Sequence, residues 1–431
     1  MIRVGFYTLG CKVSQYETEA IAESFEASGY EICDFSAFCD VYVINTCTVT
    51  AEADRKSRQI IRRAKRTNPE SIVLVCGCYS QRACDEVAKI EGVNAVIGSA
   101  GKMNLVDIAE QILKDKQNII NVTDIDSEPF EKMKITKGPR TRVYVKIEDG
   151  CECRCTYCAI PSARGPVRSK AAEDVIEEVE ALSKSGVKEI VLTGIETGSY
   201  GQDFNTEYRL ADLLVTLDKR KSAEQIRLGS LAPELVGKAF VDKVKDLAIL
   251  APHFHLSIQS GSDSVLRAMK RRYNREMALK NIEQIRASIK NATFTTDIMV
   301  GFPGETDDDF ADTVRFVREA RFLDAHVFAY SKRKDTPAEK FPNQVPENIK
   351  KARSEELIRI VSDTKQSVLK DIVESGQTLS VIFEEKRGDA WYGHSSTFAE
   401  VLVKSDLNLH GVIKNVAPIS LQGGIITGKI I

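Results

Sequence analysis

DGCECRCTYCAIPSARG, residues 149–165, decides the fold, because it holds three cysteines in the spacing C-x3-C-x2-C. Cys151, Cys155 and Cys158 can ligate three irons of a [4Fe–4S] cluster and leave the fourth iron open to a small molecule. Clusters that only transfer electrons use four cysteine ligands, so a missing fourth ligand is informative. The alternatives are three unrelated buried thiols or a zinc knuckle, but a knuckle usually has a second C-x2-C pair, and none lies downstream. We therefore expect an open iron–sulfur cluster.

The same spacing, with Tyr157 directly before the third cysteine, resembles the radical S-adenosylmethionine (SAM) superfamily. In that superfamily the amino and carboxylate groups of SAM chelate the open iron. The resemblance implies that the reduced cluster cleaves SAM to a 5′-deoxyadenosyl radical, with the three cysteines as catalytic ligands. The cofactor carries this chemistry, while the protein orients it and excludes water.

Around this motif, six apolar strands alternate with helical patterns over residues 142–345. The strands are expected at 142–147, 189–194, 225–230, 253–259, 294–300 and 324–330. Six such units predict a partial (β/α)6 barrel, whose active site lies at the carboxyl ends of the strands. Glycines and hydrogen-bonding side chains gather at these ends, which describes a cofactor pocket. The resemblance implies SAM contacts at Tyr157, Thr193, Gly194, Glu196, Ser230, Gln259 and Gly301.

The N-terminal segment, residues 1–125, also alternates strands with helices, which predicts a parallel α/β sheet. Cys11, Cys47 and Cys78 each follow an expected strand, so their loops meet at one edge of the sheet, where ligands of such sheets bind. Free cysteine is commonly a small buried hydrophobe, however, and this segment holds four others. The pattern alone leaves a second three-thiol cluster and buried thiols equally open.

The residues around these cysteines resemble the methylthiotransferase family, in the segments TLGCKVSQYETEA (8–20), INTCTVTAEADRKSR (44–58) and CGCYSQRA (76–83). The resemblance implies that Cys11, Cys47 and Cys78 ligate an auxiliary [4Fe–4S] cluster that supplies or carries sulfur, and that a second SAM donates the methyl group. Cys76 and Cys153 match no ligand position.

LGCKVSQYETEA and HVFAYSKRKDTPA (326–338) are most similar to the branch that modifies N6-threonylcarbamoyladenosine (t6A) at position 37, beside the tRNA anticodon. Ser14, Ala329 and Asp335 depart from that branch. The implied partners are tRNA, an external electron donor and a sulfur donor. The alternatives are isopentenyladenosine in tRNA, a ribosomal protein side chain, or a non-catalytic iron–sulfur or RNA-binding protein.

Charged residues suggest where RNA binds. Residues 55–66 carry seven Lys or Arg and no acid. Such a run is usually a solvated helix face, but Arg55, Arg58 and Arg62 are also candidates for phosphate contacts. The carboxylate of t6A calls for a cation, and Lys12 and Arg164 are candidates. Both residues could instead tune the clusters.

The remaining segments are a linker at 126–141, a connecting helix at 346–375 and a C-terminal segment, 376–431, of short alternating strands. These strands predict a small all-β barrel that resembles the RNA-binding TRAM domain. His394 could contact RNA, and Trp391 could either stack on RNA or fill the barrel core.

Composition is consistent with this organisation. The 431 residues are 43% hydrophobic and 28% charged, with a net charge of -2. Eleven cysteines, none after Cys158, do not form a disulfide framework. Because no membrane span or signal peptide is evident, we expect a cytoplasmic protein with no membrane partner.

Overall fold

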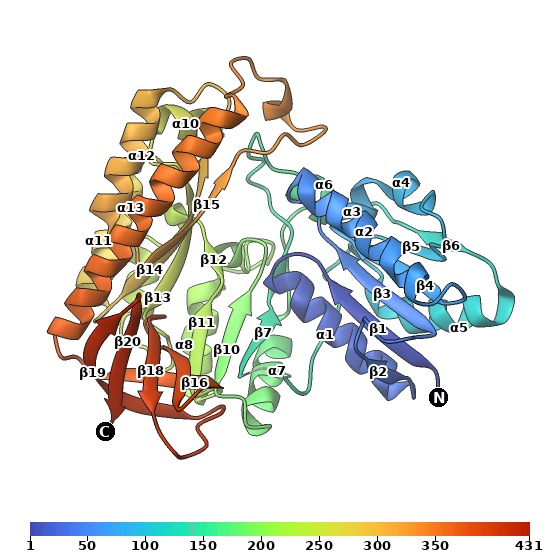
Figure 1. Cartoon of the computed structure of the whole chain (residues 1–431), viewed down its shortest axis with the longest axis horizontal. Helices are drawn as coiled ribbons and strands as arrows, with labels where there is room; N and C mark the ends of the chain where they lie inside the picture. The colour runs from blue at the N-terminus through green and yellow to red at the C-terminus, as the bar shows by residue number, and fades with distance from the viewer. Residues whose placement is uncertain (139–140) are drawn as a thin grey trace.

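Three structural units follow one another along the chain in the computed structural model, which describes residues 1–138 and 141–431. An N-terminal α/β unit packs beside a central partial barrel, and a small C-terminal β-barrel lies at one end of the central unit (Figure 1). The mixed α/β fold class is as expected from the sequence. Two residues of the expected linker, 139–140, lie outside the described residues. None of the described helices is long and apolar enough to cross a membrane.

The N-terminal unit is a six-stranded parallel sheet in the order β2-β1-β3-β4-β5-β6, as predicted. Its strands are β1 (Arg3–Thr8), β2 (Glu31–Cys33), β3 (Val41–Thr46), β4 (Ile72–Gly77), β5 (Ala95–Ile97) and β6 (Ile119–Asn121). Its helices are α1 (Lys12–Ala27), α2 (Ala51–Thr67), α3 (Cys78–Arg82), α4 (Cys84–Ala88), η1 (Lys102–Asn104) and α5 (Leu105–Asp115). The strand order reverses between β1 and β3, and such a switch point is where ligands of parallel sheets bind.

The central unit consists of two parallel sheets, β11-β10-β7 and β12-β13-β14-β15. Its strands are β7 (Arg142–Lys146), β10 (Glu189–Thr193), β11 (Gln225–Leu228), β12 (Ser230–Leu231), β13 (His253–Gln259), β14 (Thr293–Val300) and β15 (Asp324–Ala329). The third expected strand breaks at Gly229, and its two halves belong to different sheets. A Cβ at Gly229 would lie 2.7 Å from Thr197 Oγ1, so glycine allows this close approach.

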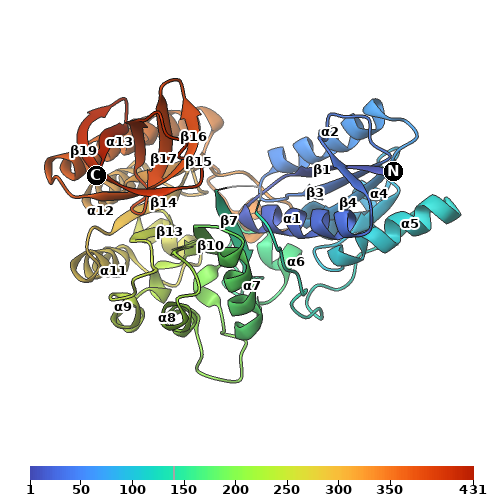
Figure 2. The same cartoon turned by 90° about the horizontal axis from the view of Figure 1, so that it is seen from below.

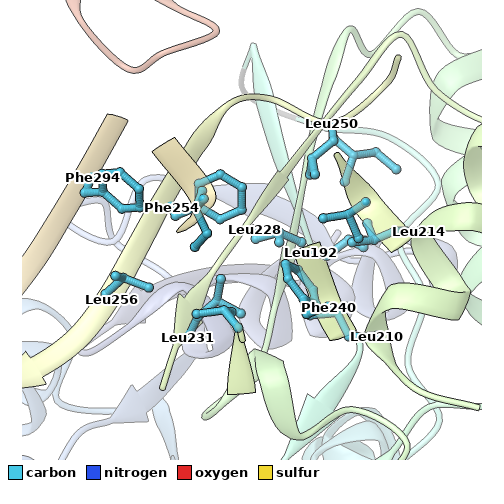
Figure 3. Packing of buried hydrophobic residues seen from close by; sticks show 14 of the residues in the cluster. Leu192, Leu210, Leu214, Leu228, Leu231, Phe240, Leu250, Phe254, Leu256 and Phe294 are labelled. Carbon is cyan, nitrogen blue, oxygen red and sulfur yellow. The ribbon is translucent and has the colours of Figure 1, made fainter. Parts of the chain in front are cut away.

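Helices cover the outer face of the central strands. They are α7 (Ala172–Lys184), α8 (Leu210–Arg220), η3 (Pro233–Leu235), α9 (Lys238–Val244), α10 (Asp263–Ala268), α11 (Arg275–Ser288) and α12 (Asp307–Ala320). Leu192 and Leu228 on the strands pack against Leu214 of α8 and Phe240 of α9 (Figure 3). The short elements are β8 (Glu148–Asp149), α6 (Ile160–Arg164), β9 (Arg168–Ser169), η2 (Thr197–Ser199) and η4 (Pro337–Lys340).

A long helix, α13 (Glu347–Glu374), leads to a closed five-stranded barrel, as the sequence predicted. Its strands are β16 (Leu379–Arg387), β17 (Ala390–Ser395), β18 (Glu400–Lys404), β19 (Ile413–Gln422) and β20 (Ile425–Ile430). Trp391 is buried in the core of this barrel and His394 faces Arg142 of the central unit, so neither is placed to stack on RNA.

The C-terminal barrel closes the amino ends of the central strands, opposite the cysteine loop (Figures 1 and 2). Arg227 of β11 donates to the carbonyl oxygens of Ser395 and Ser396. Phe398 stacks on His253 of β13 with ring centroids 4.5 Å apart. The C-terminal barrel therefore covers the amino ends of the central strands and leaves uncovered their carboxyl ends, where a parallel barrel carries its active site.

Candidate functional site

Cys11, Cys47 and Cys78 lie in three neighbouring loops at the carboxyl ends of β1, β3 and β4. The Cys11 and Cys47 loops touch, because a Cβ at Gly10 would be 3.5 Å from Cys47 Sγ. The Cys78 loop packs on the end of β3, where a Cβ at Gly77 would lie 2.6 Å from the Thr46 carbonyl oxygen. Both glycines have positive φ angles that other residues rarely adopt. The fold thus brings together the three cysteines that the sequence selected.

The loop of Cys151, Cys155 and Cys158 runs from β8 to α6 at the carboxyl end of β7. The Cys151 N–H donates to the Gly165 carbonyl oxygen at 3.0 Å, which closes the loop on itself. The turn before the loop needs glycine, because Gly150 has φ +88° and a Cβ there would lie 1.8 Å from the Pro166 carbonyl oxygen. The thiols are therefore held by a backbone of defined shape.

The guanidinium of Arg271 contacts the loop that holds Cys151, Cys155 and Cys158. Its Nη1 donates to Cys155 Sγ at 3.4 Å, and its Nη2 donates to the Ser257 carbonyl oxygen at 2.7 Å. Arg271 lies in the segment between α10 and α11. In the sequence it stood out only as part of the basic run KRRYNR, residues 270–275, and its contact with a cysteine was not predicted. A cationic donor beside a thiol stabilises the thiolate, which is the form that binds metal.

Each thiol site offers three cysteine sulfurs, the donor type that holds iron–sulfur clusters. In the described part of the chain no three His, Cys, Asp or Glu side chains are close enough to hold one ion. Burial raises the pKa of Cys47 and of Cys158 to about 12. These thiols therefore stay protonated at neutral pH until a metal displaces the proton.

A fully buried set of charges lies between the two thiol sites. Glu17 of α1 pairs with Lys102 at 2.8 Å, Lys146 at 2.9 Å and Arg164 at 2.5 Å. Asp149 pairs with Lys146 at 2.6 Å and with Arg164 at 3.1 Å. Burial raises the pKa of Glu17, but the charges of Arg164, Lys102 and Lys146 outweigh burial and hold it well below its usual range. This set joins the N-terminal unit to the barrel.

Arg164 was a candidate for binding the t6A carboxylate, and the structure argues against that role. Its side chain has no exposed surface. Its Nε donates to Cys78 Sγ at 3.0 Å, and its charge is already opposed by Glu17 and Asp149. A substrate carboxylate would have to displace these partners.

Lys12 is the other candidate, and it is exposed at the first position of α1, next to Cys11. Surrounding protein lowers its pKa, and the charges of Arg227 and Arg142 add to this effect. The carboxylate of Asp297 acts in the opposite direction and raises the pKa of Lys12.

Five of the expected SAM contacts lie at or just after the carboxyl ends of β10, β13 and β14, while Ser230 begins β12 and Tyr157 lies in the cysteine loop. Tyr157 packs edge-on against Phe302, which follows β14. Gly194 and Gly301 are also explained by close packing, because neither position has room for a side chain. A Cβ at Gly194 would lie 2.4 Å from Glu148 Oε2, and one at Gly301 would lie 2.4 Å from Lys350 Cγ. The remaining expected contacts are Thr193, Glu196, Ser230 and Gln259, of which Gln259 has φ +70°.

Two carboxyl groups below these strand ends carry raised pKa values. Burial raises the pKa of Glu196 to about 8, against the opposing effects of the Ala232 N–H and the charge of Arg271. Burial also raises the pKa of Glu148 well above its usual range. Glu148 Oε2 accepts the Glu196 N–H at 2.9 Å, while its Oε1 is buried without a partner. Perturbed carboxyl groups of this kind cluster at functional sites.

The three arginines of α2 differ in their surroundings. Arg55 is paired with Glu52 at 2.5 Å, and Arg58 donates to the Tyr79 hydroxyl at 2.9 Å. Arg62 is exposed, and no side-chain partner of it is found among the described residues. Sequence reasoning missed Arg333, whose Nη2 donates to Thr48 and Asp54 beside Cys47 and so ties the loop after β15 to the N-terminal unit.

Comparison with known proteins follows the same division of the chain. Residues 145–317 match the Radical SAM superfamily, and residues 3–98 match the uncharacterized protein family UPF0004. Threonylcarbamoyladenosine tRNA methylthiotransferase MtaB of Bacillus subtilis (strain 168) is 38% identical over 424 residues, which cover 96% of this chain and 93% of that protein. The tRNA-2-methylthio-N(6)-dimethylallyladenosine synthase of Pelotomaculum thermopropionicum is 34% identical over 424 residues, which cover 96% and 94%.

The chain belongs to the radical SAM methylthiotransferase family. A radical SAM domain implies SAM and one [4Fe–4S] cluster. Among solved structures, the radical S-adenosylmethionine methyltransferase TsrM from Kitasatospora setae has the same fold, with a TM-score of 0.58, 15% sequence identity, and coverage of 79% of this chain and 77% of that chain.

Proposed function

We propose that this enzyme transfers a methylthio group to C2 of t6A at position 37 of tRNA. The observation that carries the proposal is that one buried set of charges joins the segment of Cys151, Cys155 and Cys158 to the unit that holds Cys11, Cys47 and Cys78. The t6A substrate is supported by the similarity to two threonylcarbamoyladenosine tRNA methylthiotransferases, the MtaB proteins of Bacillus subtilis and Thermotoga maritima. The Thermotoga maritima protein is 36% identical over 444 residues, which cover 100% of this chain and 99% of that protein. The dimethylallyladenosine synthases are less similar, at 34% identity.

The residues proposed to hold the cofactors are the six cysteines. Cys151, Cys155 and Cys158 would ligate the cluster that binds SAM, and Cys11, Cys47 and Cys78 the auxiliary cluster. When bound, these groups supply one-electron chemistry, sulfur and the methyl group, which suits an aromatic carbon without an acid–base route. An external electron donor and a sulfur donor complete the reaction.

The protein itself would hold the clusters, orient the substrate and exclude water from the site. Arg271 and Arg164 each donate to one thiol, and the C-terminal barrel closes the far end of the central strands. Position 37 lies in a single-stranded loop, whose bases can be splayed into a pocket. We propose that Lys12 meets the carboxylate of t6A, while the exposed arginines of α2 track phosphates.

Mass spectrometry of tRNA nucleosides tests this proposal in cells with and without the gene. Loss of the 2-methylthio form of t6A on deletion is the expected result. Loss of only the dimethylallyl analogue would assign the substrate to the other group of relatives. Unchanged nucleosides of both kinds would favour a protein substrate.

A cysteine pair provides the matched variants for the site. In the reconstituted, reduced protein, Cys155→Ala should abolish 5′-deoxyadenosine formation and retain tRNA binding. Cys153→Ala, in the same loop but outside the ligand set, should retain both. Unchanged SAM cleavage in Cys155→Ala would contradict the ligand assignment.

A further inference from the structure

Arg164 lies between the two thiol sites, and its partners come from both units. Its Nε donates to Cys78 Sγ at 3.0 Å, and its Nη1 and Nη2 donate to the two oxygens of Glu17. Nη1 also donates to Asp149 Oδ2 at 3.1 Å. Asp149 is two residues before Cys151, and Glu17 lies on the helix that follows Cys11. One guanidinium therefore contacts one proposed ligand, Cys78, and residues of the segments that carry Cys11 and Cys151.

Arg164 is the cation of this buried set that contacts a cysteine sulfur. Three cations, Lys102, Lys146 and Arg164, directly face two carboxylates, Glu17 and Asp149, and all five side chains are buried. Glu17 and Asp149 hold the guanidinium of Arg164 in place, and its Nε donates to Cys78 Sγ. A sulfur that ligates a cluster at this position would therefore accept a hydrogen bond from a charged donor in a fixed position.

The backbone links this contact to the other site. Cys158 precedes α6, and Arg164 is the last residue of α6. The loop is closed by the bond from the Cys151 N–H to the Gly165 carbonyl oxygen at 3.0 Å. The segment that would hold the SAM-binding cluster therefore ends on the residue that contacts Cys78. The N-terminal unit alone lacks this donor.

We propose that Arg164 is a positioning residue that sets the reduction potential of the auxiliary cluster and holds that cluster at a fixed place relative to the SAM site. A charged hydrogen-bond donor on a ligating sulfur stabilises the reduced, more negative cluster and so raises its potential. The inference rests on the auxiliary cluster proposed above.

The test uses the full chain with Cys151, Cys155 and Cys158 all changed to Ala, so that only the auxiliary cluster can form. In this background the midpoint potential is measured by redox titration monitored by electron paramagnetic resonance, with iron counted for each protein. Arg164→Gln should shift the midpoint to a more negative value. Arg164→Lys keeps the buried charge, so the protein folds, but it removes the Nε donor and should give a smaller shift in the same direction.

Lys102→Met is the matched control, because it removes a buried cation from the same set without touching Cys78. Its shift should be smaller than that of Arg164→Gln. Equal shifts in these two variants, or unchanged potentials in both Arg164 variants, would overturn the inference. A background protein that binds no iron would contradict the auxiliary cluster itself, which separates the two failures.

Discussion

Replacing Glu17 with glutamine removes one negative charge from the buried set at nearly constant volume. Lys146 and Arg164 keep Asp149 as a partner. Lys102 is fully buried, and Glu17 is its only ion-pair partner within the described residues. Leaving a buried charge without its partner typically costs about 3–5 kcal/mol. We therefore expect Glu17→Gln to lower the free energy of unfolding by about that amount.

A double-mutant cycle with Lys102→Met isolates the pair. Lys102→Met alone should cost less than Glu17→Gln, because Glu17 retains Lys146 and Arg164. The double variant should be more stable than the sum of the single effects by about 1–3 kcal/mol, since its orphaned cation is gone. Anaerobic urea unfolding followed by far-ultraviolet circular dichroism measures all four proteins. A Glu17→Gln protein as stable as the wild type, or strictly additive effects, would refute the reasoning.

Acid provides a second test of the same residue. The pKa of Glu17 in the folded protein is held well below its ordinary value of 4.5. A lowered pKa contributes stability that is fully present above the ordinary value and is lost as pH falls through the folded value. The stability gap between wild type and Glu17→Gln should therefore narrow below about pH 4.5. A gap that stays constant on acidification would show that Glu17 is not charged.

Three further outcomes are expected. Gly150→Ala should lower the iron content after reconstitution, because its Cβ would lie 1.8 Å from the Pro166 carbonyl oxygen; full iron loading would contradict the rigid loop. Because the folded protein raises the pKa of Glu196 to about 8, the SAM-free wild type should lose about 1.4 kcal/mol of unfolding free energy per pH unit between pH 4.5 and about 8. Glu196→Gln should not show this loss, and parallel pH profiles of the two proteins would exclude the effect. Arg62→Gln should weaken tRNA binding and reduce the slope of log affinity against log salt by about 1, whereas Arg55→Gln, already paired with Glu52, should change both less; equal effects would mean that pairing does not matter.

The sequence predicted what depends on local pattern. The cysteine spacing was enough to select Cys151, Cys155 and Cys158. The rule that parallel strands end at one edge left Cys11, Cys47 and Cys78 open, and the resemblance of the surrounding segments to the methylthiotransferase family selected them. The break at Gly229 was not predicted, because an apolar run through a glycine looks like one strand. The buried set of charges was not predicted either, since Glu17 and Arg164 are 147 residues apart and no local pattern pairs them.

Burial decides the roles that the sequence left open. Lys12 and Arg164 were equivalent candidates by residue type and by proximity to a cysteine. The structure separates them, because Lys12 is exposed and Arg164 is enclosed by Glu17, Asp149 and Cys78. The pairing of Arg55 with Glu52, in contrast, follows from helical i,i+3 spacing and could have been seen in the sequence.

The open barrel explains why the N-terminal unit is attached where it is. A six-unit barrel does not close, so β7 and β15 are edge strands whose backbone groups need cover. α1 packs against β7 and α13 packs against β15. α1 is also the helix that begins directly after Cys11, and it carries Glu17, which pairs with Lys146 of β7. The element that covers the barrel edge is thus the element that positions the second thiol site, so the stability of the barrel and the geometry between the two sites depend on the same interface.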